Sequence, residues 1–240
     1  MNSLLSSVLE ANGGLDKWAD LNGLKAEIAY SGPFWGYKGR PEFAGVEIVE
    51  ADLQQQRILS TNAASGRAVE YSREQDRVTV SAANGNLLHA LDRPRASLAG
   101  YGPEAQWSAA QAAYFRSYAT WHYLVEPYIF IWPGVRTHET SPWNESGETW
   151  RVLQVDFPAS IDTHSGSQLY YFDESFRLRR VDYQPAVNGH TPIAHYVMEH
   201  TNVAGLEIPT RRNIHIRNED GTPDLSWTPI SLELSNTAIF

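Results

Sequence analysis

Three residues able to take part in acid-base chemistry lie at helical spacing in the middle of the sequence. Tyr118, His122 and Glu126 are spaced four residues apart, so a helix would place all three on one face. A carboxylate beside an imidazole can orient it and favour its protonated form, which makes His122 a candidate general base. A neighbouring tyrosine hydroxyl could donate to a developing oxyanion. The alternative is structural: these residues satisfy backbone groups or pair with Arg116 or Arg211.

The segment around these residues is unusually rich in aromatic side chains. Residues 107–130 read WSAAQAAYFRSYATWHYLVEPYIF, and a helix over 107–125 would carry large aromatic rings on every side. Since a surface helix keeps one polar face, this helix must be enclosed, and Pro127 ends or bends it. Tyr114, Trp121 and Tyr123 are therefore candidate walls of a ligand cavity.

The rest of the chain must enclose this helix, and most of it reads as antiparallel strand. Apolar and polar residues alternate from Leu24 to Ser31, the pattern of a half-buried strand. Further strands are expected at 42–52, 56–61, 68–73, 77–82, 136–141, 148–157, 168–173, 177–184, 193–201, 206–218 with a break at Pro209, and 230–240. A short amphipathic helix is expected at 2–11 and a helical turn at 15–21, with tight turns at 173–176 and 218–221.

These elements predict an α+β fold that is mostly β. A strongly curved antiparallel sheet, of about eight to eleven strands, would wrap around the aromatic helix. No composition shift or linker separates two cores, so residues 1–240 are expected to form one domain.

Composition excludes several classes of function. The formal charge is −9 with only 19 Lys and Arg residues, so a nucleic-acid partner is not expected. Cysteine is absent, which excludes disulfides, thiolate catalysis and Cys-ligated metals. No apolar run approaches the roughly 20 residues of a membrane-spanning helix. The N-terminus lacks a basic region and an unbroken apolar run, so we expect a cytoplasmic protein.

The sequence predicts neither a metal nor an organic cofactor. Nucleotide-binding glycine motifs and a G-x-S-x-G elbow are missing. The segment HYVMEH at 195–200 resembles a zinc motif, but on a strand His195 and Glu199 would face one side and His200 the other. His195 and Tyr196 are instead candidate ligand-binding residues.

Adjacent arginines follow Pro209 on an expected strand. Arg211 and Arg212 must point to opposite faces. One of them could reach the cavity as an anion anchor, and Arg211 is taken as the candidate.

Three segments of the chain resemble a known superfamily. LEANGGLDKWADLNGLKAEIAYSG near the start, LYYFDESFRLRRVDY and HTNVAGLEIPTRRNI are similar to parts of the LolA/LolB-like outer-membrane lipoprotein carriers. The resemblance implies a half-barrel closed by helices over an apolar cavity. This chain departs from the carriers because it shows no export signal. The superfamily also includes cytosolic members, among them cofactor-free enzymes of natural-product assembly.

Two functions follow from these observations. The first is a cofactor-independent enzyme acting on a small hydrophobic or aromatic metabolite by cyclisation, isomerisation or similar proton transfer, with Tyr118, His122 and Glu126 as catalytic residues. The alternative is a non-catalytic cytosolic protein that binds a hydrophobic ligand such as a fatty acyl chain. A third reading is an accessory subunit whose aromatic groove accepts a partner. Buried His and Glu favour the enzyme, because a passive apolar carrier only loses desolvation free energy by containing them.

Overall fold

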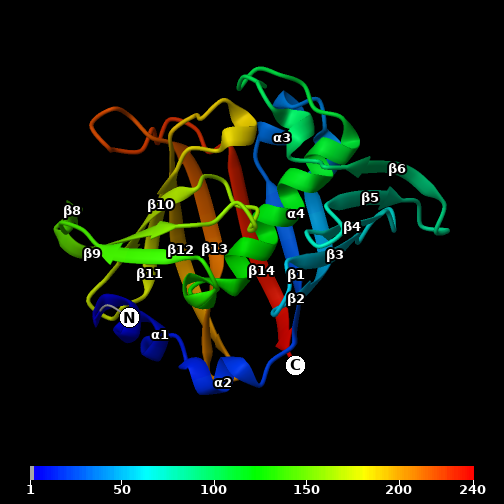
Figure 1. Cartoon of the computed structure of the whole chain (residues 1–240). Coiled ribbons are helices and arrows are strands. Elements are labelled where there is room, and N and C mark those ends of the chain that lie inside the picture. The colour runs from blue at the N-terminus through cyan, green and yellow to red at the C-terminus, as the bar shows by residue number, and fades with distance from the viewer. Residues whose placement is uncertain (1–2) are drawn as a thin grey trace.

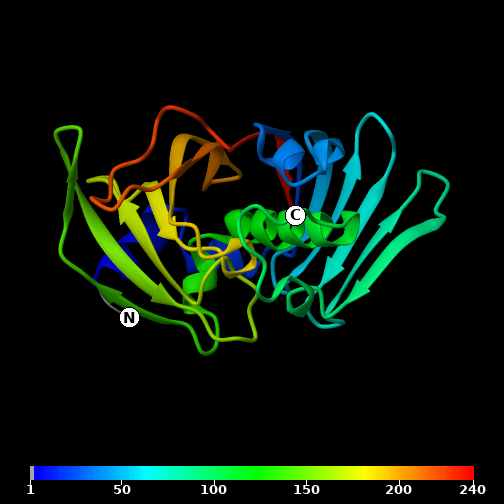
Figure 2. The ribbon, with the colours of Figure 1, turned by 90° about the horizontal axis from the view of Figure 1, so that it is seen from above.

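One antiparallel sheet of fourteen strands curves around one long helix (Figures 1 and 2). This is a computed structural model, and it describes residues 3–240. The strand order is β6-β5-β4-β3-β2-β1-β14-β13-β12-β11-β10-β9-β7, and β8 pairs with β9 alone. β6 and β7 are the edges of the sheet, which stays open as a half-barrel. The predicted fold class is therefore confirmed.

The strands have the following bounds: β1 Gly23–Ser31, β2 Gly45–Asp52, β3 Arg57–Asn62, β4 Ala68–Ser72, β5 Arg77–Ser81, β6 Leu87–Asp92, β7 Arg136–Glu139, β8 Trp143–Glu145, β9 Glu148–Asp156, β10 Ser167–Phe172, β11 Leu178–Tyr183, β12 Ile193–Val203, β13 Leu206–Ile216 and β14 Ile230–Ile239. β1 shows why such segments form strands: Leu24, Ala26, Ile28 and Tyr30 are buried, whereas Lys25 and Ala29 are exposed. This alternation covers one face of the sheet with apolar side chains, and that face packs on the helix.

The sheet differs from the prediction at three places. It has more strands than expected, because β6 and β8 bury no side chain and so lack an apolar alternation. The expected break at Pro209 is absent, and β13 runs through it. Pro209 faces His200, where β12 is bulged, and a bulge tolerates a residue without an N–H.

The enclosed helix is α4, Ala109–Val125. It begins two residues later than predicted because Ser108 is its N-cap: Gln111 N–H donates to Ser108 Oγ and Ser108 N–H to Gln111 Oε1. Fifteen of its seventeen residues are buried, so the prediction of an enclosed helix is confirmed. It packs against β3, β4, β5, β6 and β13, and Figure 2 shows it in the hollow of the sheet.

The remaining helices are short and lie at the ends of the half-barrel. α1 (Ser3–Ala11) and α2 (Leu15–Ala19) lie near one end, and α3 (Phe34–Tyr37) lies at the other (Figure 1). The expected start of the first helix at residue 2 lies outside the described residues. Short 3-10 helices occur at Pro41–Phe43, Ala96–Leu98, Tyr128–Ile131 and Ala186–Asn188. None of the helices within residues 3–240 is both long and apolar enough to cross a bilayer.

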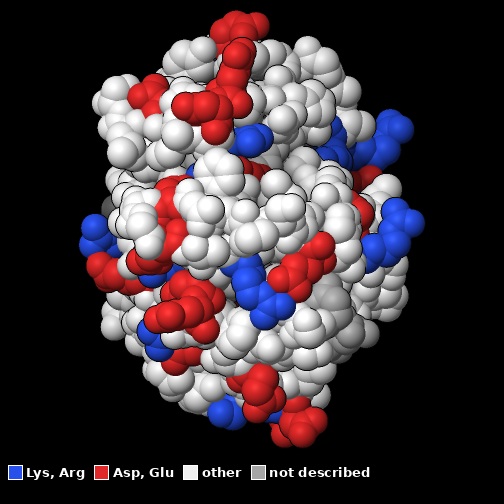
Figure 3. Space-filling model, turned by 90° about the vertical axis from the view of Figure 1, so that its left-hand side faces the viewer, with Lys and Arg blue, Asp and Glu red and all other residues white. Residues whose placement is uncertain are grey.

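Acidic and basic side chains are interspersed over the face shown in Figure 3, rather than gathered into one basic patch. Ion pairs also join neighbouring strands at the surface, such as Arg151 of β9 with Glu139 of β7 at 2.7 Å. This face offers little to a phosphate backbone.

Candidate functional site

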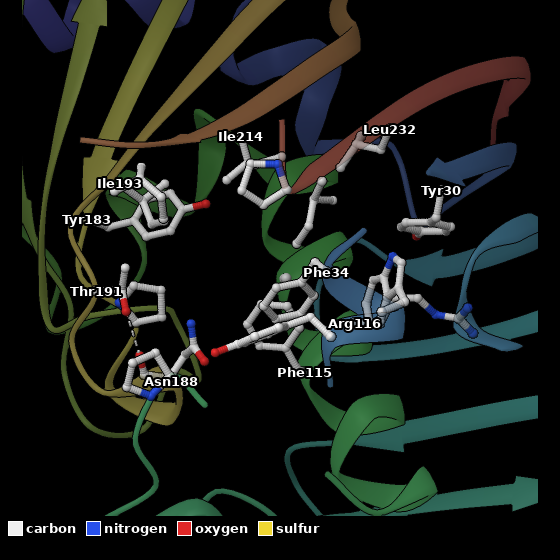
Figure 4. A pocket seen from close by; sticks show the side chains of 18 of the residues that line it. Tyr30, Phe34, Phe115, Arg116, Tyr183, Asn188, Thr191, Ile193, Ile214 and Leu232 are labelled. Atoms are coloured by element: carbon white, nitrogen blue, oxygen red, sulfur yellow. Dashed lines mark hydrogen bonds between the residues drawn. The ribbon is translucent and has the colours of Figure 1, made fainter. Parts of the chain in front are cut away.

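A pocket of about 270 Å³ lies between α4 and the concave face of the sheet (Figure 4). This volume is close to the lower end of the range for small-molecule sites. β1, β12, β13 and β14 form one wall, α4 forms the other, and α3 with the loops around Pro103, Pro185 and Trp227 completes the pocket.

Helical and strand periodicities explain which side chains line the pocket. On α4, Phe115, Ala119 and Tyr123 are four residues apart and share one face. On β13 and β14, Ile214 and Leu232 occupy inward positions of the strands. The walls are therefore almost entirely apolar and aromatic.

Aromatic rings pack closely at the end of the pocket near α3. The ring of Phe34 lies 5.5 Å from those of Trp35, Trp107 and Phe115. Lys38 Nζ donates to the carbonyls of Pro103 and Ala105. α3 is thereby fastened to a loop that lines the pocket.

Arg116 is the cation among the pocket-lining residues, and it is already paired within the protein. Its Nη1 lies 2.7 Å from Glu47 Oε1 and also donates to the carbonyl of Phe43 at 3.1 Å. Both side chains of the ion pair are buried. Arg116 is therefore held by Glu47, a carboxylate that also pairs with Arg67 at 3.2 Å.

A chain of polar groups runs from α4 past the pocket to the sheet. Tyr118 Oη lies 3.1 Å from His164 Nδ1, and His164 Nε2 lies 2.7 Å from Tyr123 Oη. Tyr123 Oη is 3.4 Å from Tyr183 Oη, which is 3.2 Å from His195 Nδ1. Tyr123 and Tyr183 also line the pocket, so the chain brings polar groups to an apolar wall.

Burial keeps the groups of this chain uncharged. It lowers the pKa of His164 and of His195 well below the usual value, and nearby positive charges lower both further. Burial also raises the pKa of Tyr123 and of Tyr183 above the usual value. At neutral pH the chain therefore consists of neutral imidazoles and phenols, which can exchange hydrogen bonds without a net charge.

The three predicted catalytic residues do not line the pocket. His122 Nε2 does lie next to Glu126 Oε1, at 3.4 Å, but its closer partner is Tyr170 Oη at 2.8 Å. Tyr118 bonds instead to His164. Burial, together with the charge of Arg212, lowers the pKa of His122 to about 3, which opposes the effect expected of Glu126. The catalytic role of these residues stays a prediction.

Of the predicted ligand-binding residues on α4, one lines the pocket and two do not. Tyr123 lies in the pocket wall. Tyr114 Oη donates to Asp162 at 2.8 Å and Trp121 Nε1 donates to the carbonyl of Asp52 at 2.7 Å, both away from the pocket.

The predicted residues of the later strands are also outside the wall. His195 lies behind Tyr123 and Tyr183, with ring centroids 4.8 and 6.0 Å away. Tyr196 packs in a small second cluster with Trp150 and Tyr171, where its hydroxyl donates to Glu145.

Arg211 is exposed and bonds to exposed Glu199 at 2.7 Å, whereas Arg212 takes the inward position. The expectation that His195 and Glu199 share a face is wrong, because bulges in β12 at Val197–Glu199 and Glu199–His200 interrupt the alternation. Among the described residues, no three His, Cys, Asp or Glu side chains are placed to hold a metal ion.

Several pocket residues were missed by the sequence analysis, notably Phe34, Tyr183, Asn188, Ile214 and Leu232. The alternation of apolar and polar residues along β13 and β14 predicts that Ile214 and Leu232 face inward. It does not predict which inward-facing residues line the same pocket, because that depends on the order of the strands in the sheet. Phe34 and Asn188 lie in short helical turns with no periodic signal.

No protein-family model matches the sequence, and no curated protein matches it. Two solved structures share the fold. A LolA superfamily protein from Nitrosomonas europaea has a TM-score of 0.51 at 13% identity, covering 96% of this chain and 91% of that one. A Vibrio parahaemolyticus domain described as outer membrane lipoprotein-sorting has a TM-score of 0.51 at 8% identity, covering 98% and 90%. The chain therefore has a LolA-like fold.

Proposed function

We propose that this protein binds a small hydrophobic or aromatic molecule in the pocket between α4 and β12, β13 and β14. The observation that carries the proposal is the pocket itself, a space of about 270 Å³ with apolar walls and a paired arginine as its cation. The LolA-like fold supports it, since one of the similar solved structures is described as an outer membrane lipoprotein-sorting domain.

Binding is favoured over catalysis by the position of the acid-base residues. His122, Glu126 and Tyr118 are buried outside the pocket wall, and each has a polar partner within the protein. The structural role considered for these residues is the simpler explanation of such contacts. A cofactor-independent reaction and a cytoplasmic location stay predictions from the sequence.

A bulky substitution in the pocket wall tests the proposal. Ala119 is small, buried and faces the pocket from α4, so Ala119→Trp would fill part of the space that the ligand needs. The probe is 2-isopropylnaphthalene, a neutral fluorescent hydrocarbon. We expect one probe molecule per chain and a loss of about tenfold or more in affinity in Ala119→Trp.

The matched control is Leu59→Trp, which adds the same ring at an exposed position of β3. This variant should bind as the wild type does, and circular dichroism should show that both variants fold. Equal affinity of Ala119→Trp and wild type would place the probe elsewhere and overturn the proposal.

A further inference from the structure

The hydrogen bonds that join Tyr118, His164 and Tyr123 beside the pocket can run in either of two directions. In one direction Tyr118 donates to His164 Nδ1, and His164 Nε2–H donates to Tyr123 Oη. In the other, Tyr123 donates to His164 Nε2 and His164 Nδ1–H donates to Tyr118 Oη. The second direction leaves the Tyr118 hydroxyl proton without an acceptor among residues 3–240, although this side chain is fully buried.

The first direction is favoured, because an unpaired buried donor carries a desolvation penalty. Neutral imidazole has one N–H and one acceptor nitrogen. In His164, Nδ1 then accepts from Tyr118 and Nε2–H donates to Tyr123. Tyr123 Oη accepts from His164 and keeps its own proton. The chain therefore delivers a hydrogen-bond donor to the residue that lines the pocket.

The proton of Tyr123 has a weak partner inside the protein. The distance from Tyr123 Oη to Tyr183 Oη is 3.4 Å, well beyond the usual 2.7–2.8 Å between hydroxyl oxygens. By the same criterion His195 Nδ1–H donates to Tyr183 Oη, because an Nε2–H on this ring would be a buried donor without a partner. Tyr183 can in turn donate to Tyr123 Oη, which leaves the proton of Tyr123 uncommitted. Tyr123 also keeps part of its surface exposed, whereas Tyr118, Tyr170 and Tyr183 are buried. Figure 4 shows the Tyr183 hydroxyl directed into the same space.

The charges near the pocket wall indicate whether a charged or a neutral ligand group would accept the hydrogen bond from Tyr123. Arg116 pairs with Glu47, and Arg212 lies outside the wall, where it pairs with Glu126. No unpaired cation is therefore found among the described pocket-lining residues. A carboxylate would lose its hydration here without gaining an ion pair, whereas a carbonyl needs one donor.

We propose that the ligand is an apolar molecule with one neutral hydrogen-bond acceptor, a ketone or ester carbonyl, and that Tyr123 Oη donates to that oxygen. This rests on the proposed function, since it assigns a ligand class to the same pocket. Tyr123 thereby determines specificity, while His164 and Tyr118 position its hydroxyl.

Two probes of nearly the same shape test the proposal. 2-Acetylnaphthalene carries the carbonyl, and 2-isopropylnaphthalene replaces its oxygen with a methyl group. We expect Tyr123→Phe to bind the ketone about tenfold more weakly than wild type does, the factor equivalent to one buried hydrogen bond. The affinity for the hydrocarbon should be the same in both proteins, because this probe makes no hydrogen bond. The anion 2-naphthoate should bind more weakly than the ketone.

The carbonyl stretching band of bound 2-acetylnaphthalene gives a second readout, which needs no variant. In wild type it should shift to lower frequency relative to the ketone in hexane, and Tyr123→Phe should abolish this shift. Tyr196→Phe is the control, since it removes a tyrosine hydroxyl that lies outside the pocket and donates to Glu145, and it should keep the shift.

The outcomes separate the two proposals. If the hydrocarbon binds in the pocket but the band of the bound ketone is not shifted and Tyr123→Phe does not weaken its binding, the carbonyl proposal is overturned and hydrophobic binding stands. A shifted band that persists in Tyr123→Phe overturns the assignment to Tyr123. If neither probe binds, both proposals fail.

Discussion

Arg212 Nη2 on β13 lies 2.9 Å from Glu126 Oε2 at the end of α4, and each side chain is at most 2% exposed. Arg212 also donates to the carbonyl of Tyr123 at 3.2 Å and packs over that ring. These contacts fasten the enclosed helix to the sheet next to the polar chain.

Removing the arginine of this pair should destabilise the protein strongly. Arg212→Met leaves Glu126 buried without its cation, a situation that costs about 3–5 kcal/mol. The adjacent Arg211 provides a matched control, because its pair with Glu199 is exposed and Arg211→Met should change the free energy of unfolding by at most about 0.5 kcal/mol. Urea unfolding measures both. Similar losses in the two variants would contradict the buried pair.

Tyr118 should be essential for stability. Its side chain is fully buried in contact with Tyr114, Phe115 and His164, so Tyr118→Ala should lower the free energy of unfolding by about 3 kcal/mol or more. Tyr118→Phe keeps the packing and loses one hydrogen bond, which should cost about 1–2 kcal/mol. A loss below about 1 kcal/mol for the alanine variant, measured by denaturant unfolding, would place this ring at the surface.

Buried neutral histidines should make the protein sensitive to mild acid. Burial lowers the pKa of His122 to about 3, and the pKa values of His164 and His195 also lie well below the usual value. Below about pH 6.5 the unfolded chain then binds protons that the folded chain does not. Stability should therefore be full above this pH and fall as the pH decreases, by up to about 1.4 kcal/mol per pH unit for each histidine.

Unfolding in urea at a series of pH values between about 7 and 5 measures this slope. His164→Phe removes one buried imidazole and should reduce it, whereas His89→Gln, at an exposed position, should leave it unchanged. An equal slope in wild type and His164→Phe would show that His164 takes up its proton without unfolding.

Periodicity predicted the scaffold well, and it did so wherever one side of an element is buried. The alternating apolar residues from Leu24 to Tyr30 predicted a half-buried strand. The aromatic residues on all sides of α4 predicted an enclosed helix. β6 escaped prediction because none of its side chains is buried. The bulges of β12 also left no sequence signal, so the predicted facing of Glu199 failed. That residues 1–240 form one domain stays a prediction.

The site was less predictable, because its contacts join residues far apart in the chain. Spacing on a helix placed His122 beside Glu126, which the structure shows. It could not reveal that Tyr118 turns to His164, 46 residues away, or that Glu126 pairs with Arg212, 86 residues away. Such partners depend on strand order, which helical spacing does not specify.

Locating a bound probe tests hydrophobic binding in this pocket most directly. With 2-isopropylnaphthalene and protein labelled at Ile and Leu methyl groups, isotope-filtered nuclear Overhauser spectra report which methyl groups touch the ring. We predict contacts to Ile214 and Leu232 in the pocket wall. Contacts instead to the exposed Leu87 and Leu88 of β6, with none to Ile214 or Leu232, would contradict binding between α4 and the sheet.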